Sequence, residues 1–299
     1  MKHLLRMLDL SSEEIIELLN LADQLKYEQK HGIAHKKLAG KTLGMIFQKA
    51  STRTRVSFEV GMTQLGGYPL VMGAGDLQMG RGEPIKDTAR VLSRYLDGIM
   101  IRTFAQQDVE DLAKYGSIPV INGLTDYTHP CQALTDLMTI REHKGKLEGL
   151  KLCYIGDGNN MANALIVGGL KVNMQVAVAT PKDYRPDPSV LAFAQGNPVF
   201  SLTEDIFTAA RDADVVVTDV WASMGQEGEA ERRKKAFAGY QVNDELMAAA
   251  RPDAMVQHCL PAHRGEEITE QVMESHPEIF DEAENRLHAQ KAILVKLMA

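Results

Sequence analysis

The sequence lacks any apolar stretch long enough to cross a membrane. A membrane-spanning helix needs about 20 consecutive apolar residues, and no run in the 299 residues approaches that length. The start of the chain, MKHLLRMLDLSSEE, is interrupted by Arg6 and Asp9 before the apolar core of a signal peptide could form. We therefore expect a cytoplasmic protein that has no membrane partner.

Cysteine is scarce, and its placement excludes two kinds of site. Cys131, Cys153 and Cys259 are odd in number, lie far apart in the sequence and form no Cys-x-x-Cys pair. This argues against a disulfide framework and against a cysteine zinc site. We expect three reduced thiols in a reducing compartment.

The sequence also has no excess of positive charge. Against 33 lysines and arginines stand 40 acidic residues, which gives a net charge of 33 − 40 = −7 and disfavours nucleic acid or an anionic membrane as a partner. The one basic cluster, at residues 232–235, stands beside the acidic stretch GQEGEAE, which favours a solvated loop or helix face. An acidic chain that concentrates arginine elsewhere is expected to bind a small anion.

Several nucleotide and hydrolase motifs are absent or incomplete. The sequence AGKT at residues 39–42 ends like a P-loop, but His35 occupies the position of the required first glycine. IGDGNNMA has two glycines of a dinucleotide motif, but Met161 occupies the third position. No Gly-x-Ser-x-Gly or His-Glu-x-x-His is present, so these motifs indicate neither a nucleotide site nor a hydrolase site.

What is present is a regular alternation of short apolar runs with amphipathic segments. One series extends from TLGMIF to IPVING and a second from KLCYIG to MVQHCL, separated by the polar junction EHKGKLEGLK. Such alternation predicts an α/β protein with two doubly wound parallel-sheet domains and a cleft between them. We place the first domain at residues 1–145 and the second at 146–281. The last helix, at 282–299, has no strand after it and is expected to pack back on the first domain.

The densest polar cluster is STRTR, Ser51 to Arg55, between the predicted strand TLGMIF and a predicted helix. The first N–H groups of a helix are unpaired and carry the positive end of its dipole, so this position suits an oxyanion. Hydroxyls of Ser51, Thr52 and Thr54 can donate to phosphate oxygens, and Arg53 can bind two of them. A plain N-cap with solvated arginines would explain any one of these residues, whereas the cluster favours an anion site.

Other polar residues also follow predicted strands, where ligands bind in open parallel sheets. These residues are Arg102, His129, Gln132, Asn160, Asp219 and Cys259. Three of them also have a local structural explanation. His129 would then be a packed or surface histidine, Asp219 an Asx turn that ends a strand, and Cys259 an inert buried thiol.

The segment after the predicted strand DVVVT holds the only tryptophan and a Ser-Met-Gly turn. Asp219 there is suited to pair with a cationic group of a substrate. The following residues, 226–239, are highly charged and poor in apolar side chains. They fit a lid that closes over a substrate and equally an exposed insertion.

Taken together, six segments resemble the aspartate/ornithine carbamoyltransferase family and occur in family order: STRTRVSFE, DTARVLSRYLDGIMIR, HPCQALTDL, GDGNN, DVWASMGQE and HCLPAHRG. The match runs nearly end to end. STRTR and HPxQAL are shared widely within the family and imply carbamoyl phosphate as a substrate. The Asp-x-Trp-x-Ser-Met-Gly and His-Cys-Leu-Pro stretches resemble the ornithine branch, and the HPLPR of the aspartate branch is absent.

The resemblance implies transfer of the carbamoyl group of carbamoyl phosphate to the δ-amine of L-ornithine, giving L-citrulline and phosphate without a metal or organic cofactor. It assigns carbamoyl phosphate binding to Ser51, Thr52, Arg53, Thr54, Gln78, Arg102, His129, Gln132, Cys259, Leu260 and Arg286. It assigns ornithine binding to Asn160, Asp219, Ser223 and Met224. The catalytic residues would be Arg102, His129, Asp219 and Cys259.

The resemblance also implies a homotrimer, or a multiple of trimers, in which residues 75–82, including Gln78, reach a neighbouring active site. Two other acceptors remain open. Putrescine would leave Asn160 unmatched and N-acylated ornithine would leave Asp219 unmatched, at a cost of about 1–3 kcal/mol each. A non-catalytic anion-binding protein on the same fold is a further alternative.

Overall fold

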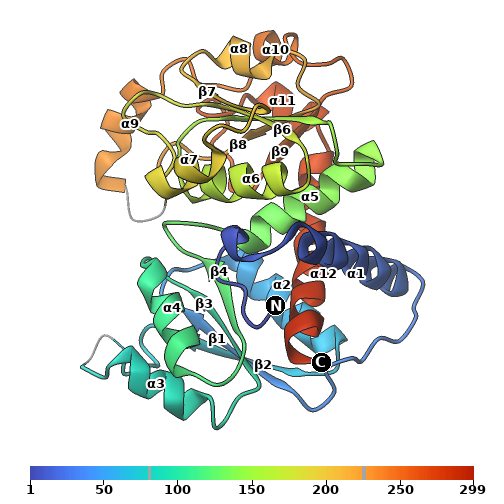
Figure 1. Cartoon of the computed structure of the whole chain (residues 1–299), viewed down its shortest axis with the longest axis vertical. Coiled ribbons are helices and arrows are strands. Elements are labelled where there is room, and N and C mark those ends of the chain that lie inside the picture. The colour runs from blue at the N-terminus through green and yellow to red at the C-terminus, as the bar shows by residue number, and fades with distance from the viewer. Residues whose placement is uncertain (80–81, 224–226) are drawn as a thin grey trace. The chain divides into compact units, whose positions relative to one another are not determined.

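A computed structural model of the protein describes residues 1–79, 82–223 and 227–299. The chain divides into two compact units, one of residues Met1–Met138 with Asn285–Ala299 and one of residues Thr139–Glu284. Each unit contains one parallel sheet flanked by helices, which confirms the predicted α/β class with two wound sheets (Figure 1). Within the described ranges, no helix has the length and apolar character that a membrane crossing requires.

The sheet of the first unit has the strand order β2-β1-β3-β4, with every pair parallel. Its strands are β1 (Thr42–Phe47), β2 (Tyr68–Gly73), β3 (Gly98–Arg102) and β4 (Val120–Leu124). The inner strands β1 and β3 are buried along almost their whole length. They therefore appear in the sequence as continuous apolar runs rather than as alternating patterns. The strand order reverses between β1 and β3, which places a ligand-binding switch point at the carboxyl ends of these two strands.

Helices cover both faces of this sheet. They are the short 3-10 helix η1 (Met7–Asp9), α1 (Ser12–Lys30), α2 (Thr52–Gln64), α3 (Ile85–Leu92) and α4 (Gln106–Tyr115). The predicted capping box of α1 is present, since Ser11 and Glu14 cap each other's backbone N–H groups. The helices α3 and α4 lie on one side of the sheet (Figure 1), where Ala89 and Leu112 pack against strand residues such as Ile99.

Two helices cross the division between the units: α5 (Pro130–Lys144) and α12 (Glu278–Met298). From Asn285 onward, α12 belongs to the first unit and packs against α2. A Cβ added at Gly61 would lie 3.2 Å from Cγ of Lys291, so the missing side chain permits this close approach. Ser57 and Gln290 are also hydrogen-bonded at 2.6 Å. These contacts confirm that the last helix packs back on the N-terminal part of the chain.

The sheet of the second unit has the order β7-β6-β5-β8-β9, again fully parallel. Its strands are β5 (Lys151–Ile155), β6 (Gln175–Ala179), β7 (Phe200–Thr203), β8 (Val215–Thr218) and β9 (Met255–His258). The strand order reverses between β5 and β8. The residues that follow these two strands therefore occupy the switch point of this sheet.

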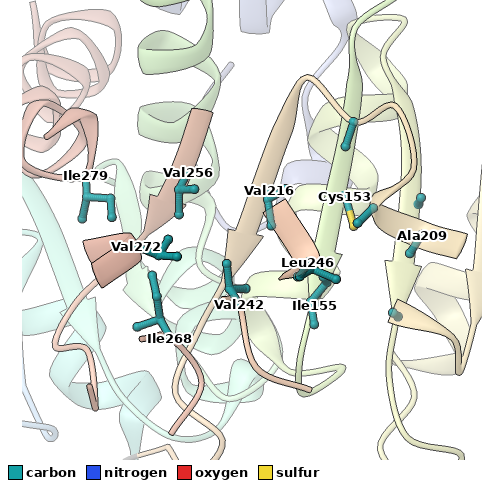
Figure 2. Close-up of a cluster of buried hydrophobic side chains, with 14 of the residues drawn as sticks. Cys153, Ile155, Ala209, Val216, Val242, Leu246, Val256, Ile268, Val272 and Ile279 are labelled. Carbon is teal, nitrogen blue, oxygen red and sulfur yellow. The ribbon is translucent and has the colours of Figure 1, made fainter. Parts of the chain in front are cut away.

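The helices of the second unit are shorter, apart from α6. They are α6 (Asn160–Lys171), α7 (Pro188–Ala194), α8 (Ile206–Ala210), the 3-10 helix η2 (Glu227–Glu229), α9 (Ala230–Ala236), α10 (Asp244–Met247) and α11 (Glu270–Ser275). Figure 2 shows the core on one face of the sheet, where Val216 and Val256 from the strands meet Leu246 and Val272 from α10 and α11. This core fixes the strand ends that carry the polar residues described next.

Candidate active site

The start of α2 carries the STRTR cluster. Ser51 is its N-cap, and the Ser51 Oγ accepts the backbone N–H of Thr54 at 3.1 Å. The simple N-cap explanation therefore holds for Ser51, whereas Thr54 is 1% exposed and makes a different contact. Arg55 pairs with Glu59 at 3.2 Å on the exposed face of the helix. Of the two arginines in the cluster, Arg55 is thus engaged in a surface pair, whereas Arg53 is close enough to His129 to lower the pKa of its imidazole.

Arg286 of α12 joins two residues that are far away in the sequence. Its Nη1 donates to Oε1 of Gln132 at 2.6 Å, and its Nη2 donates to Oγ1 of Thr54 at 3.1 Å. Gln132 in turn donates to Asp136 at 2.7 Å. Because the Thr54 oxygen accepts from Arg286, its own hydroxyl hydrogen can donate to a ligand. The structure thus brings Thr54, Gln132 and Arg286 together.

His129 lies at the start of α5 and is buried. Burial lowers its pKa well below the ordinary value of 6.5, and the positive charges of Arg286, Arg102 and Arg53 lower it further. Among the described residues, the His129 Nδ1 has no hydrogen-bond partner. At neutral pH this imidazole is therefore uncharged and stands among three guanidinium groups. Arg102 and Arg286 are buried and Arg53 is half-buried, and such a concentration of positive charge is suited to an anionic ligand.

A buried lysine that sequence reasoning missed supports this region. Lys49, two residues before Ser51, is 5% exposed, forms an ion pair with Asp126 and lies 4.3 Å from the centre of the Phe104 ring. Asp126 also donates its backbone N–H to the Phe104 carbonyl at 2.9 Å. These contacts join the loops that follow β1, β3 and β4. The sequence does show a lysine directly after a predicted buried strand, which could have marked Lys49 as a candidate. It could not identify the residues that Lys49 contacts.

One of the residues predicted to bind carbamoyl phosphate lies apart from the others. Gln78 lies on an exposed segment after β2, and none of the hydrogen bonds found in the described part of the chain joins it to His129 or Arg286. Arg102, the last residue of β3, is 9% exposed and close enough to His129 to affect its pKa. The first unit therefore brings Arg53, Arg102 and Arg286 near His129, and Arg286 to Thr54 and Gln132, whereas none of these contacts includes Thr52 or Gln78.

In the second unit, Asn159 connects the ends of β5 and β8. Its Oδ1 caps α6 by accepting the N–H groups of Met161 and Ala162. Its Nδ2 donates to Oδ2 of Asp219 at 2.8 Å. Oδ1 of Asp219 accepts the Cys259 thiol at 3.1 Å. The predicted site residues Asp219 and Cys259 are thus in direct contact. Asn159, which the sequence did not indicate, binds the other oxygen of Asp219.

Two further predicted residues belong to this unit, and one lies outside the described residues. Asn160 is the first residue of α6 and is buried, with 8% of its surface exposed. Ser223 is half-buried and follows Asp219 by four positions. Met224 lies outside the described residues. The buried carboxylate of Asp219, surrounded by neutral donors, is suited to bind a small cationic group.

The Gly-Asp-Gly turn after β5 has a packing explanation. A Cβ at Gly158 would lie 2.3 Å from the backbone carbon of Arg185, and the Gly158 N–H donates to the Tyr184 carbonyl at 2.8 Å. Glycine is therefore required for the close approach of two backbone segments. This accounts for a glycine pattern that partly matches a dinucleotide motif.

A buried pair fixes the turn that contains Cys259 and Leu260. The His258 Nε2 donates to Oε1 of Glu267 at 3.1 Å, while the His258 Nδ1 accepts the backbone N–H of Leu260 at 2.9 Å. Both side chains of the pair are almost fully buried. Leu260 has φ = 58°, in the left-handed region that costs a non-glycine residue about 1–3 kcal/mol. The pair supplies a hydrogen bond that holds this conformation.

The described residues include two groups whose potential metal ligand atoms lie within 4.8 Å of one another. They are Asp219 with His258 and Cys259, and His263 with Glu266 and Glu267. In the first group both nitrogens of His258 are already hydrogen-bonded, so a metal would have to displace one of these bonds. In the second group Glu266 pairs with Lys234 at 2.8 Å.

The expectation of a fully solvated basic cluster at residues 232–235 is wrong at Arg233. This side chain is 6% exposed and forms an ion pair with Asp157 at 2.6 Å, while Arg232 is exposed. Phe237, directly after α9, is fully buried. The described part of residues 226–239 is therefore not merely an exposed insertion. A charge pattern alone could not reveal this, because the partner Asp157 lies 76 positions away.

Comparison with known proteins extends these observations to the whole chain. Residues 2–142 match the family model described as aspartate/ornithine carbamoyltransferase, carbamoyl-P binding domain. Residues 148–297 match the model described as aspartate/ornithine carbamoyltransferase, Asp/Orn binding domain. The two models together cover nearly all of the sequence.

Individual relatives agree with the family models. The chain is 60% identical to an ornithine carbamoyltransferase of Carboxydothermus hydrogenoformans, over 98% of this chain and 96% of the relative. The solved ornithine carbamoyltransferase of Pyrococcus furiosus has a TM-score of 0.95 at 56% identity, covering 99% of this chain and 97% of that one. The solved anabolic ornithine carbamoyltransferase of Campylobacter jejuni has a TM-score of 0.94 at 43% identity, with 99% of both chains covered. By sequence and by fold, the chain belongs to the aspartate/ornithine carbamoyltransferase family.

Proposed function

We propose that this protein is an ornithine carbamoyltransferase, which transfers the carbamoyl group of carbamoyl phosphate to the δ-amine of L-ornithine and releases L-citrulline and phosphate. The observation that carries the proposal is the uncharged, buried His129 among the guanidinium groups of Arg53, Arg102 and Arg286. An acyl phosphate that carries two negative charges on its phosphate and a neutral carbamoyl group matches this combination of cations and a neutral hydrogen-bond donor. Relatives named ornithine carbamoyltransferase at 55–60% identity support the same assignment.

On this proposal the first unit binds carbamoyl phosphate. The N-terminus of α2 and Arg53 bind the phosphate, because unpaired N–H groups and a guanidinium favour an oxyanion. Arg102, His129 and the hydroxyl of Thr54 lie around the carbamoyl oxygen. The full proposed set is Ser51, Thr52, Arg53, Thr54, Gln78, Arg102, His129, Gln132 and Arg286, with Cys259 and Leu260 of the second unit at the reacting centre.

The second unit binds ornithine on this proposal. The carboxylate of Asp219 binds the α-ammonium group, and the amide of Asn160 binds the α-carboxylate. Asp219 is prepared for this role because Asn159 and Cys259 hold both of its oxygens in place. Ser223 and Met224 complete the proposed set.

The chemistry then follows from the residue types. The neutral δ-amine attacks the carbamoyl carbon, and negative charge develops on the carbamoyl oxygen. Arg102, His129 and Thr54 stabilise that charge, and one such donor typically contributes about 2.7–4 kcal/mol. Since His129 is uncharged, it acts as a hydrogen-bond donor rather than as a proton donor. The new C–N bond forms as the C–O bond to phosphate breaks, and the departing phosphate takes the proton lost by the amine.

A parallel assay tests the proposal directly. Purified protein with carbamoyl phosphate is offered L-ornithine, putrescine, N-acetylornithine or L-aspartate, and the ureido product is measured. We expect citrulline from ornithine and at least a hundredfold lower kcat/KM for the other three, because each leaves a buried polar group unmatched or lacks the δ-amine. A preference for putrescine or N-acetylornithine would reassign the acceptor. Turnover with none of the four would favour a non-catalytic anion-binding protein.

We also propose that the protein works in the cytoplasm as a homotrimer or a multiple of trimers. Tyr68 and Leu70 on the edge strand β2, and Val56 on α2, are exposed apolar residues of the kind that subunit contacts cover. The exposed Gln78 would then bind the substrate of a neighbouring subunit. Sedimentation analysis of the active protein tests this, and a fully active monomer would contradict it.

A further inference from the structure

The helix α9 has one inward-facing charge among several outward-facing ones. Its sequence AERRKKA is strongly charged, and Arg232, Lys234 and Lys235 are exposed. Arg233 is 6% exposed. A guanidinium is costly to bury unless its donors are satisfied, so the contacts of Arg233 indicate what its burial achieves.

Arg233 makes contact with four separate segments of the second unit. Its Nη1 donates to Oδ2 of Asp157 at 2.6 Å and to the backbone carbonyl of Trp221 at 2.9 Å. Its Nε donates to Glu229 at 3.3 Å. The guanidinium also lies over the ring of Tyr184, 5.1 Å from its centre. One side chain thus joins the turn after β5, the turn after β8, the loop before α7 and the N-cap residue of its own helix.

Two of these segments carry the proposed ornithine ligands. Trp221 lies two residues after Asp219 and two residues before Ser223. Asp157 lies two residues before Asn159, which donates to Asp219 at 2.8 Å. By binding Trp221 and Asp157 with the same nitrogen, Arg233 fixes the spacing between the two turns around Asp219.

The electrostatics of the pair make this link sensitive to the loss of either partner. Burial raises the pKa of Asp157 to about 6, and the attraction of Arg233 only partly offsets this effect. Without Arg233, a buried carboxylate would have to take up a proton or move toward water. Loss of Arg233 also takes this donor away from the Trp221 carbonyl, which loosens the turn that precedes Ser223.

We propose that Arg233 is a positioning residue for ornithine: by joining Asp157 to the Trp221 carbonyl it sets the geometry of the acceptor site without touching either substrate. This inference rests on the proposed function. It goes beyond that function because the residue lies outside every assigned ligand position. The sheet does not depend on it, since β5 pairs directly with β8 and Phe237 packs with Tyr184 and Trp221. Loss of Arg233 should therefore affect the acceptor site more than the fold.

The test compares Arg233→Met with Arg232→Met, its exposed neighbour of the same type. Both variants are assayed for citrulline formation, with kcat and a KM for each substrate, and their thermal unfolding is recorded. We expect Arg233→Met to raise the KM for ornithine about 10- to 100-fold, with the KM for carbamoyl phosphate within threefold of wild type. Arg232→Met should match wild type. Arg233→Lys, which keeps the charge, should recover part of the ornithine affinity.

Asp157→Asn provides a second route if Arg233→Met does not fold. It keeps the shape and one acceptor oxygen while removing the charge, and it should also raise the KM for ornithine selectively. Equal increases in both KM values, or wild-type values in Arg233→Met or Asp157→Asn, would overturn the inference while leaving the proposed function intact. Wild-type protein that forms no citrulline would reject the proposed function and, with it, this role for Arg233.

Discussion

The two units of the molecule treat buried charge in opposite ways. In the first unit, in addition to burial, three cations, Arg286, Arg102 and Arg53, lower the pKa of His129, and Arg286 donates to the neutral oxygens of Gln132 and Thr54. In the second unit, the carboxylate of Asp219 accepts from the neutral groups of Asn159 and Cys259. The first unit is thus prepared for an anion and the second for a cation. In both units the charged side chain is buried and hydrogen-bonded to neutral partners. Because these partners do not neutralise the charge, a ligand group of opposite charge can still pair with it.

The largest effect is expected from removing a cation of the first unit. Arg53→Ala deletes a guanidinium that acts on His129 at the N-terminus of α2. We expect kcat/KM for carbamoyl phosphate to fall about 10²- to 10³-fold, the range found when one transition-state donor is removed. Steady-state kinetics at saturating ornithine measures this loss.

Arg55→Ala is the matched control for this experiment. Arg55 is two positions further along the same helix but is exposed and paired with Glu59. Since such a surface pair typically contributes only about 0.3–0.5 kcal/mol, activity should stay within about twofold of wild type. Equal losses in both variants would mean that general surface charge, not the buried cluster, attracts the substrate.

A smaller loss, confined to the other substrate, is expected from Asp219→Asn. The substitution keeps the hydrogen-bonding shape but removes the charge proposed to bind the α-ammonium group. The KM for ornithine should rise about 30-fold, as expected for loss of a charge-assisted hydrogen bond worth about 2 kcal/mol. The KM for carbamoyl phosphate should not change. The exposed Asp183→Asn serves as control, and a shared loss for both substrates would remove the proposed division between the units.

The fold was predictable from the sequence because the inner strands are buried on both faces. TLGMIF and DVVVT are continuous apolar runs, and β1 and β8 occupy them closely. The same physics explains why the candidate residues could be found, since parallel strands bring their carboxyl ends to one edge. Asn160 and Asp219 follow β5 and β8, which are neighbours in the sheet. That adjacency is a property of strand order, which the sequence alone does not specify.

The partners of the site residues were not predictable. Arg233 was expected in a solvated cluster, because its neighbours are charged and its partner Asp157 is 76 positions away. Lys49, Asn159 and Glu267 were missed for the same reason, as each acts through a contact that only the folded chain creates. Local composition indicates which polar residues are candidates for a site. Which groups each of them contacts depends on residues far away in the sequence.

The pH dependence of activity sharpens the comparison further. The pKa of His129 is well below 6.5, so His129 should neither gain nor lose a proton above pH 7. The δ-amine of ornithine resembles that of lysine, with an ordinary pKa of about 10.4. Its neutral fraction rises about tenfold per pH unit, and kcat/KM for ornithine should rise nearly as steeply from pH 6.5 to 8.5. A flat profile would contradict attack by a free amine.

The smallest effects are expected in stability, where the two units should respond to pH with opposite signs. For His129 the folded pKa lies below the unfolded value of 6.5, so stability is present above pH 6.5 and is lost as the pH falls below it. For Asp157 the folded pKa is raised from 3.8 to about 6, so stability is present below pH 3.8 and is lost as the pH rises through 6.

Hydrogen exchange of the β4 and β5 amides measures each unit by itself. In the wild type, protection of β4 should decrease from pH 6.5 to 5, and His129→Gln should remove part of that decrease. Over the same range protection of β5 should increase as the pH falls, and Asp157→Asn should remove part of that increase, after correction for the intrinsic exchange rate. The same sign of change in both strands would mean that His129 is not held neutral by the guanidinium groups or that Arg233 keeps Asp157 fully ionised, and the electrostatic contrast between the units would be lost.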